Sequence, residues 1–371
     1  MHTLPTCTQD LWEYLAVSKK TVVLYGMGNG ADKILDVCAQ KGVTVRGVFA
    51  SDGFVRNKFF HGMPVRTWSE TKAEYGAENL IVLLAFGSSR EDVLENILRI
   101  ADEAELYAPD VPAFGDVLFD RAFYEAHKAE LTDARALFSD AESLRIFDNV
   151  LSYKLTGDVR FLLDAESDMD AVWREIVCPT EIGAAADLGA YNGDTVRELI
   201  EKSGDNVQKI YAVEPDARNH KKLAAYAEEE TRCCVIPVHA GAWSESTTLT
   251  FDKSGNRNAS FGKNRSQVLA SRPIKTVEIP AEPLDRILNG ARVDYVKYDV
   301  EGSEKEALIG SCETIQKHTP TLLVSLYHRS EDLFALPLMI RSLFPAYNRY
   351  YLRRVRGIPA WDLNLYVKKE D

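Results

Sequence analysis

One run in the second half of the chain combines glycines with carboxylates: Asp187-Leu188-Gly189-Ala190-Tyr191-Asn192-Gly193-Asp194-Thr195. It follows an apolar segment and opens a helical pattern, and ligands of open α/β sheets bind at such strand-to-helix turns. Its spacing differs from G-x-G-x-x-G, and Asp187 and Asp194 would repel a pyrophosphate. The turn therefore favours a ligand with a cationic part, and its candidate binding residues are Asp187, Gly189, Ala190, Tyr191, Asn192, Gly193 and Thr195.

A second acid lies at the end of the next predicted strand, where Glu214 is followed by Pro215. An acid at this position of a doubly wound sheet accepts hydrogen bonds from the ribose hydroxyls of a nucleoside. Pro215 restricts Glu214 to an extended backbone. The turn and the Glu214-Pro215 pair together describe a site for a cationic nucleoside, and S-adenosylmethionine meets that description.

A third run, Val293 to Glu304, supplies candidates for catalysis. Lys297 and Asp299 have the same strand parity, so they point to one face and can form a buried ion pair. Asp299 ends its strand and His328 follows the next one, so both can face a methyl acceptor. Methyl transfer to a hydroxyl needs in-line orientation and removal of the hydroxyl proton. We expect Asp299, His328 and Lys297 to be catalytic, with Asp299 and Glu301 also at the cofactor.

Four ordered motifs resemble the FkbM-type methyltransferase family, whose pattern is D-x-G-A-x-x-G, E-P, L-D-x-x-L and V-D-x-x-K-x-D-V-E-G-x-E. Here the motifs are Asp187–Gly193, Glu214-Pro215, Leu284–Leu288 and Val293–Glu304. The resemblance covers roughly residues 183–330, about half of the chain. It implies a seven-stranded S-adenosylmethionine-dependent methyltransferase sheet, and methylation of oxygen on a sugar, a glycan precursor or a related small molecule.

The sequence departs from the family pattern at two places. Tyr191 stands where the family commonly has Asn, and the family's late E-x-H element reads Ser325-Leu326-Tyr327-His328, without the acid. The missing acid leaves open an alternative function: a non-catalytic nucleotide or nucleotide-sugar binding module that retains the methyltransferase fold.

Each candidate residue also has a purely structural interpretation. Asp187 and Glu214 can cap strand ends, and His328 can be a hydrogen-bonded core histidine. Asp299 and Glu301 can form a helix N-cap box with Ser303 and Glu304. A divalent metal held by Asp299 and His328 is a further alternative, but two ligands do not define a site, and we expect no metal.

Predicted strands and helices alternate in both halves of the chain. Apolar runs at 21–25, 43–49 and 80–86, with helical spacing at 31–40 and 91–100, predict a first parallel sheet. Alternation restarts after 181, whereas 116–180 has long helical periodicity. The expected fold is α/β: two doubly wound Rossmann-like domains, 1–115 and 181–371, joined by a helical connector, 116–180, with the second domain forming the seven-stranded methyltransferase sheet.

The first domain carries a loose dinucleotide fingerprint, Gly26-x-Gly28-x-x-Ala31, with Asp52 where a ribose acid would stand. Its 47–65 block also resembles nucleotide-sugar-binding domains attached to some sugar-modifying transferases. Three roles stay open: nucleotide or nucleotide-sugar binding, an NAD-dependent reaction, or a structural unit that mediates a homo-oligomer.

A polar loop between two strand-like segments contains six cations and no acid: Lys253, Arg257, Lys263, Arg265, Arg272 and Lys275. If this loop covers the acceptor pocket, Lys263 and Arg265 are the candidate substrate-binding residues, and an anionic acceptor such as a nucleotide-linked sugar is favoured. A solvated loop is the competing interpretation.

Composition limits the remaining classes of function. The net charge of −12 argues against general nucleic-acid binding, although 116–180 alone holds seven basic and 14 acidic residues. No apolar run approaches the roughly 20 residues of a membrane span, and 1–10 lacks the order of a signal peptide, so we expect a cytoplasmic protein without a membrane partner. The six scattered cysteines predict neither a disulfide framework nor a zinc site.

Overall fold

The computed structural model describes residues 4–51, 59–252 and 276–370. Its amino-terminal half is built on a six-stranded sheet in the order β3-β4-β2-β1-β5-β6. The strands are β1 (Thr21–Tyr25), β2 (Val45–Phe49), β3 (Phe59–Phe60), β4 (Met63–Arg66), β5 (Leu80–Leu84) and β6 (Glu105–Tyr107). The strand pairs are parallel except β3 with β4.

Both faces of this sheet are covered by helices, which explains why β1 and β5 read as continuous apolar runs. The helices are α1 (Leu11–Val17), α2 (Asn29–Gln40), α3 (Trp68–Tyr75) and α4 (Glu91–Glu103), with a 3-10 turn at Ala77–Asn79. Val23 of β1 packs in one core cluster with Ile97 of α4. Leu24 packs in the opposite cluster with Ile34 of α2. Alternate residues of β1 therefore pack against helices on opposite faces of the sheet.

The second half is built on a seven-stranded sheet in the order β15-β16-β14-β13-β7-β8-β9. Its strands are β7 (Ala184–Leu188), β8 (Lys209–Val213), β9 (Cys234–Val238), β13 (Tyr295–Tyr298), β14 (Thr321–Ser325), β15 (Arg349–Arg354) and β16 (Leu363–Lys368). The first five are parallel, and β16 is antiparallel to both β14 and β15. The helices of this half are α10 (Asp194–Ser203), α11 (Ala217–Glu229), α12 (Leu284–Leu288), α13 (Glu304–Ile309), α14 (Cys312–His318) and α15 (Asp332–Leu343).

A small three-stranded sheet of β10 (Gly241–Ala242), β11 (Thr247–Asp252) and β12 (Thr276–Glu282) lies beside the main sheet. The antiparallel pair β11–β12 flanks 253–275. The fold class expected from the sequence is confirmed: two doubly wound sheets, the second with seven strands.

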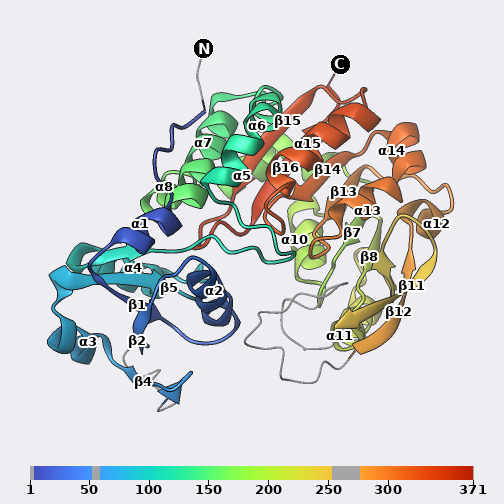
Figure 1. Cartoon of the computed structure of the whole chain (residues 1–371). Helices are drawn as coiled ribbons and strands as arrows, with labels where there is room; N and C mark the ends of the chain where they lie inside the picture. Colours follow the sequence, from blue (N-terminus) through green and yellow to red (C-terminus); the bar gives the residue numbers. More distant parts are fainter. Residues whose placement is uncertain (1–3, 52–58, 253–275, 371) are drawn as a thin grey trace.

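The segment between the two sheets is helical, with α5 (Arg121–Ala126), α6 (Lys128–Arg135), α7 (Ala141–Thr156), α8 (Arg160–Leu163) and α9 (Met169–Ala171), followed by a π-helical turn at Val172–Val177 and a 3-10 turn at Pro179–Glu181. Figure 1 shows α5, α6 and α7 beside β15 and β16. Phe147 of α7 joins the core of the second sheet, whereas Tyr153 of the same helix joins the core of the first. This segment thus packs against both sheets. The domain boundaries at 115 and 180 remain predictions.

Two direct contacts also join the halves. Ser88, after β5, forms an isolated antiparallel bridge with Ile358 in the loop between β15 and β16, and Arg356 of that loop pairs with Glu91 of α4 at 2.9 Å. Among the described helices none is long and apolar enough to cross a membrane. In the same residues all six cysteines are free, with Cys38 and Cys233 buried and Cys234 exposed.

Candidate functional site

The carboxyl ends of β7 and β13 bring Asp187 and Lys297 together. The two residues are direct cross-strand partners, and the Lys297 ammonium lies 3.4 Å from Asp187 and 3.2 Å from Asp299. The Thr195 hydroxyl donates to the other oxygen of Asp187. Burial opposes the charge of Lys297, but the two carboxylates hold its pKa above the ordinary value. The predicted Lys297–Asp299 pair is therefore present, and Asp187 makes it a triad.

The turn after β7 runs very close to the loop after β13. Gly189 has φ +91°, and a Cβ at this position would collide with the carbonyl oxygen of Asp299. The amides of Gly189 and Ala190 both donate to the Val213 carbonyl, at 2.9 and 3.0 Å. Only glycine permits both this backbone conformation and this approach.

Within the same turn, Tyr191 has φ +48°, a left-handed conformation in which Asn is enriched. This explains in physical terms why Asn suits the position. The side-chain oxygen of the neighbouring Asn192 is buried without a hydrogen-bond partner among the described residues. Gly193 then caps α10 with φ +86°. A buried amide oxygen without a donor is an acceptor available to a ligand.

Glu214 closes this turn from the end of β8. One of its oxygens accepts from the Tyr191 amide at 2.9 Å, and the other accepts from the Asp216 amide at 2.7 Å. Burial raises the pKa of Glu214 to about 7, although both amides oppose that shift. The next residue, Pro215, offers its carbonyl to His239 at 3.1 Å. Each oxygen of Glu214 keeps a lone pair for a further donor.

Asp299, just beyond β13, is held by three donors. Its carboxylate pairs with Lys297 and accepts from the hydroxyls of Ser325 at 3.0 Å and Tyr327 at 3.1 Å. Burial opposes ionisation, but Lys297 and His328 lower the pKa of Asp299 to about 2. Asp299 is therefore ionised at neutral pH and is a weak proton acceptor there.

His328, buried after β14, faces three carboxylates. Its Nδ1 lies 2.8 Å from Glu304, and its Nε2 lies 3.5 Å from Glu301 and 3.6 Å from Asp299. Burial favours the neutral ring, but these acids, Glu304 first, raise the pKa of His328 to about 10. Its Nε2 makes no hydrogen bond within the described residues, and His328 is one of the residues that line the cavity described below.

Glu301 adopts φ +55° after β13, and its side chain keeps about a third of its surface exposed. Burial of its carboxyl group raises the pKa to about 8, against the lowering effect of His328. Asp299 and Glu301 form no N-cap box with Ser303 and Glu304, because Ser303 caps α13 without a side-chain hydrogen bond. Glu304 instead accepts from the amides of Val300 and Gly302.

Comparisons with known proteins bear on the second half of the chain and on the overall fold. Residues 187–351 match the family model described as the methyltransferase FkbM domain. The chain contains an FkbM methyltransferase domain. The crystal structure of methyltransferase FkbM from Methylobacillus flagellatus superimposes with a TM-score of 0.70 at 18% identity, covering 94% of this chain and 90% of that one. The shared fold therefore extends over both halves, beyond the FkbM domain itself.

Two further solved structures are more distant. Aeropyrum pernix fibrillarin in complex with S-adenosyl-L-methionine has a TM-score of 0.32 at 14% identity, covering 51% of this chain and 68% of that one. The S-adenosylhomocysteine-bound methyltransferase PaMTH1 of Podospora anserina has a TM-score of 0.33 at 11% identity, covering 76% of this chain and 97% of that one. No curated protein matches the chain.

The FkbM domain contains two site residues that the sequence analysis did not assign. Glu304 supplies an acid to His328, so the histidine has a carboxylate partner although position 326 is leucine. Tyr327 donates to Asp299 and lines the cavity next to His328. Glu304 belongs to the same motif as Glu301, which was the available signal; the reach of Tyr327 needed the structure.

Some predicted residues are not tested by this geometry. Lys263 and Arg265, the substrate-binding candidates near the FkbM site, lie outside the described residues, as does Asp52 of the first domain. Within the described ranges no group of three or more His, Cys, Asp or Glu side chains has an arrangement that could hold a metal ion.

Proposed function

We propose that the protein is an S-adenosylmethionine-dependent methyltransferase that methylates a hydroxyl oxygen of a sugar, a glycan precursor or a related small molecule. The observation that carries the proposal is the cluster at the carboxyl ends of β7, β8 and β13. It combines two buried acids, Asp187 and Glu214, with the unpartnered amide oxygen of Asn192. All three are acceptors, as the ammonium and ribose hydroxyls of this cofactor require.

When bound, S-adenosylmethionine supplies a methyl group on a sulfonium, whose carbon–sulfur bond breaks as the acceptor oxygen attacks. The chain's own residues would orient the two reactants and receive the acceptor proton. Glu214 would accept from the ribose hydroxyls, and Asn192 and Asp187 would face the amino acid part. Lys297 is a positioning residue, because it lies buried between Asp187 and Asp299 and holds both strand ends together.

Glu301 is the group best placed to receive the proton of the acceptor hydroxyl, next to the protonated His328. A carboxyl group with a pKa of about 8 is well matched to proton transfer near neutral pH. The adjacent His328 cation would stabilise the negative charge that develops as the hydroxyl proton leaves. Asp299, with its low pKa, would act instead as a hydrogen-bonding clamp.

The alternative of a non-catalytic module rested on the acid missing before His328. Glu304 provides an acid to the same imidazole at 2.8 Å, so that reason for doubting turnover is weaker. The cytoplasmic location stays part of the proposal, and we propose no metal requirement.

Titration calorimetry with S-adenosylhomocysteine tests the cofactor site. We expect the folded protein to bind, and Glu214→Gln to weaken binding by about 1.5–3 kcal/mol, roughly 10- to 100-fold, through loss of charge-assisted hydrogen bonds. Glu201→Gln, at an exposed position of α10, is the matched control and should bind like wild type. No binding to the folded wild-type protein would refute the cofactor claim, and an unchanged Glu214→Gln affinity would remove Glu214 from the site.

A further inference from the structure

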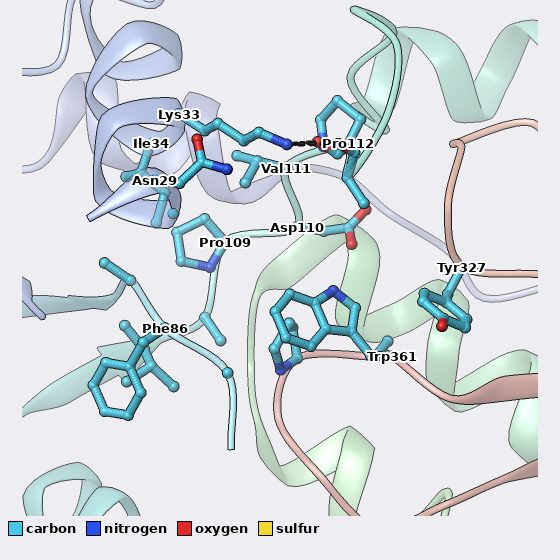
Figure 2. A pocket seen from close by; sticks show the side chains of 18 of the residues that line it. Asn29, Lys33, Ile34, Phe86, Pro109, Asp110, Val111, Pro112, Tyr327 and Trp361 are labelled. Carbon is cyan, nitrogen blue, oxygen red and sulfur yellow. Dashed lines mark hydrogen bonds between the residues drawn. The ribbon is translucent and has the colours of Figure 1, made fainter. Parts of the chain in front are cut away.

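A cavity of about 390 Å³ lies between the two halves of the chain. Its amino-terminal wall comes from the turn after β1, the turn after β5 and the 108–113 segment, and its other wall from Glu301, Tyr327, His328 and the 359–362 loop. Figure 2 shows Asn29, Asp110, Trp361 and Tyr327 around this space. One cavity therefore touches both the first domain and the proton-transfer residues of the second.

On the first domain this cavity lies at the position where doubly wound sheets bind ligands. β1 is flanked by β2 and β5, so the chain changes direction between β1 and β5. Ligands bind outside the carboxyl ends of the strands at such a switch point. Gly30, in the first turn of α2, approaches so closely that a Cβ would collide with the Ala85 carbonyl oxygen. This contact holds the start of α2 against the end of β5.

The amino-terminal wall carries a cation without a carboxylate partner. Lys33 reaches from α2 to the carbonyl oxygens of Pro112 at 2.9 Å and Ala113 at 2.6 Å (Figure 2). Among the described residues no ion pair includes Lys33. Burial lowers its pKa to about 8, and Glu301 opposes this shift without forming an ion pair with Lys33. A ligand anion would supply the charge that Lys33 lacks.

The first turn of α2 adds donors to the same wall. Gly28 caps this 12-residue helix without a side-chain hydrogen bond, and Asn29 and Gly30 line the cavity. Free amides and the helix dipole favour an anion there. His328, buried beside its carboxylate neighbours, lines the opposite wall of the cavity.

Three acids also line the cavity: Asp110, Glu301 and Asp362. Lys154 donates to Asp110 at 2.8 Å. Burial raises the pKa of Glu301 and, with help from Asp299, that of Asp362. His328 and Arg329 are further cations in the lining. The wall near Lys33 therefore keeps a net attraction for an anion.

Trp361 provides a flat apolar surface between the two walls. Its indole lies against Gly87, where a Cβ would collide with the ring, and 45% of the residue remains exposed. An aromatic ring held in this way, next to polar side chains, suits the apolar face of a sugar ring or a nucleobase.

We propose that this cavity binds the methyl acceptor as a phosphate-bearing sugar, with the phosphate at Lys33 and the start of α2, the ring against Trp361, and the reacting hydroxyl beside Glu301 and His328. The last contact rests on the proposed methyltransferase function, whereas the phosphate site stands on the first domain's own residues. The amino-terminal domain is then a substrate-binding domain.

Calorimetry with UDP-glucose, glucose 1-phosphate and glucose, each as a single probe, tests the proposal. We expect the phosphate-bearing probes to bind and glucose to bind at least tenfold more weakly. Equal binding of both phosphate probes would point to a sugar phosphate as the acceptor, and binding of UDP-glucose alone to a nucleotide-linked sugar. Binding of neither, or of glucose equally well, would overturn the proposal.

Variants locate the phosphate. Lys33→Met should weaken the phosphate-bearing probe at least tenfold, Lys33→Arg should restore part of the affinity, and Lys128→Met, at an exposed position of α6, should change nothing. Because Lys33 also satisfies two carbonyls, Asn29→Asp gives a second test: an acid in the first turn suits a helix N-terminus but repels phosphate. Unchanged affinity in both Lys33→Met and Asn29→Asp would overturn the site.

S-adenosylhomocysteine binding, measured in the same preparations, separates the two proposals. If S-adenosylhomocysteine binds and the phosphate-bearing probes do not, the acceptor proposal fails while the cofactor site stands. If the phosphate-bearing probes bind and S-adenosylhomocysteine does not, the methyltransferase proposal fails while the phosphate site stands.

Discussion

The charge of His328 depends on its carboxylate neighbours more than on its burial. Burial alone would favour the neutral imidazole, yet Glu304 at 2.8 Å, with Glu301 and Asp299 at 3.5 and 3.6 Å, keeps the ring protonated at neutral pH. The ring therefore donates or stabilises charge, and Glu301 is left as the group that can accept a proton.

Glu304→Gln tests this arrangement. Removing the nearest negative charge while burial persists should lower the pKa of His328 from about 10, as followed by NMR titration of labelled histidines with His328→Gln for assignment. The pKa of this histidine is higher in the folded protein than in the unfolded chain. Its contribution to the free energy of unfolding is therefore fully present below about pH 6.5 and declines as the pH rises toward 10. In Glu304→Gln the free energy of unfolding should therefore fall much less between about pH 6.5 and pH 10 than in wild type.

Glu313→Gln, at an exposed position of α14, removes a carboxylate of the same type far from the imidazole and should leave the titration as in wild type. A His328 pKa that stays near 10 in Glu304→Gln would contradict the role given to Glu304.

At the scale of elements, the site depends on how closely the turn after β7 meets the loop after β13. Gly189 makes that approach possible, and it places Asp187, Asp299 and Lys297 at one sheet edge. The positions of the strands along the chain and the parity of Lys297 and Asp299 were predictable from the alternation of apolar runs. The direct pairing of Lys297 with Asp187 was not, because register between strands 110 positions apart is set by packing.

Gly189→Ala should destabilise the fold by about 2–4 kcal/mol, because left-handed strain adds to a backbone collision. The measurement is urea unfolding followed by circular dichroism. Gly42→Ala is the matched control: Gly42 also has positive φ, but a Cβ there would meet open space, so its loss should be limited to about 1–2 kcal/mol of strain. An equal loss of unfolding free energy in the two variants would mean that the backbone collision at position 189 adds nothing to the destabilisation.

At the scale of the whole molecule, one cavity is lined by both halves of the chain, and the helical segment packs against the cores of both. α7 contributes Phe147 to one core and Tyr153 to the other, and the loop before β16 bridges Ser88 while carrying Trp361 into the cavity. Both sheets therefore present carboxyl ends to the same cavity.

This shared cavity could not be predicted from the sequence. The motifs of the second half identified the cofactor candidates and His328, because those residues follow strands of a single sheet. Lys33, Asp110 and Trp361 belong to no motif that the analysis recognised, and they meet only through packing between segments more than 70 residues apart. The fingerprint that begins at Gly26 includes residues that line this cavity, but it gave no indication that the second half of the chain would supply the opposite wall.

Taken together, the two proposals require the transferred methyl group to lie beside Glu301 and His328, at the shared cavity. A crystal structure of the protein with bound S-adenosylhomocysteine tests it most directly. The account predicts ribose hydroxyls within hydrogen-bonding distance of Glu214 and the sulfur directed toward Glu301 and His328. S-adenosylhomocysteine bound in the crevice of the first domain, or with its sulfur directed away from Glu301 and His328, would contradict it.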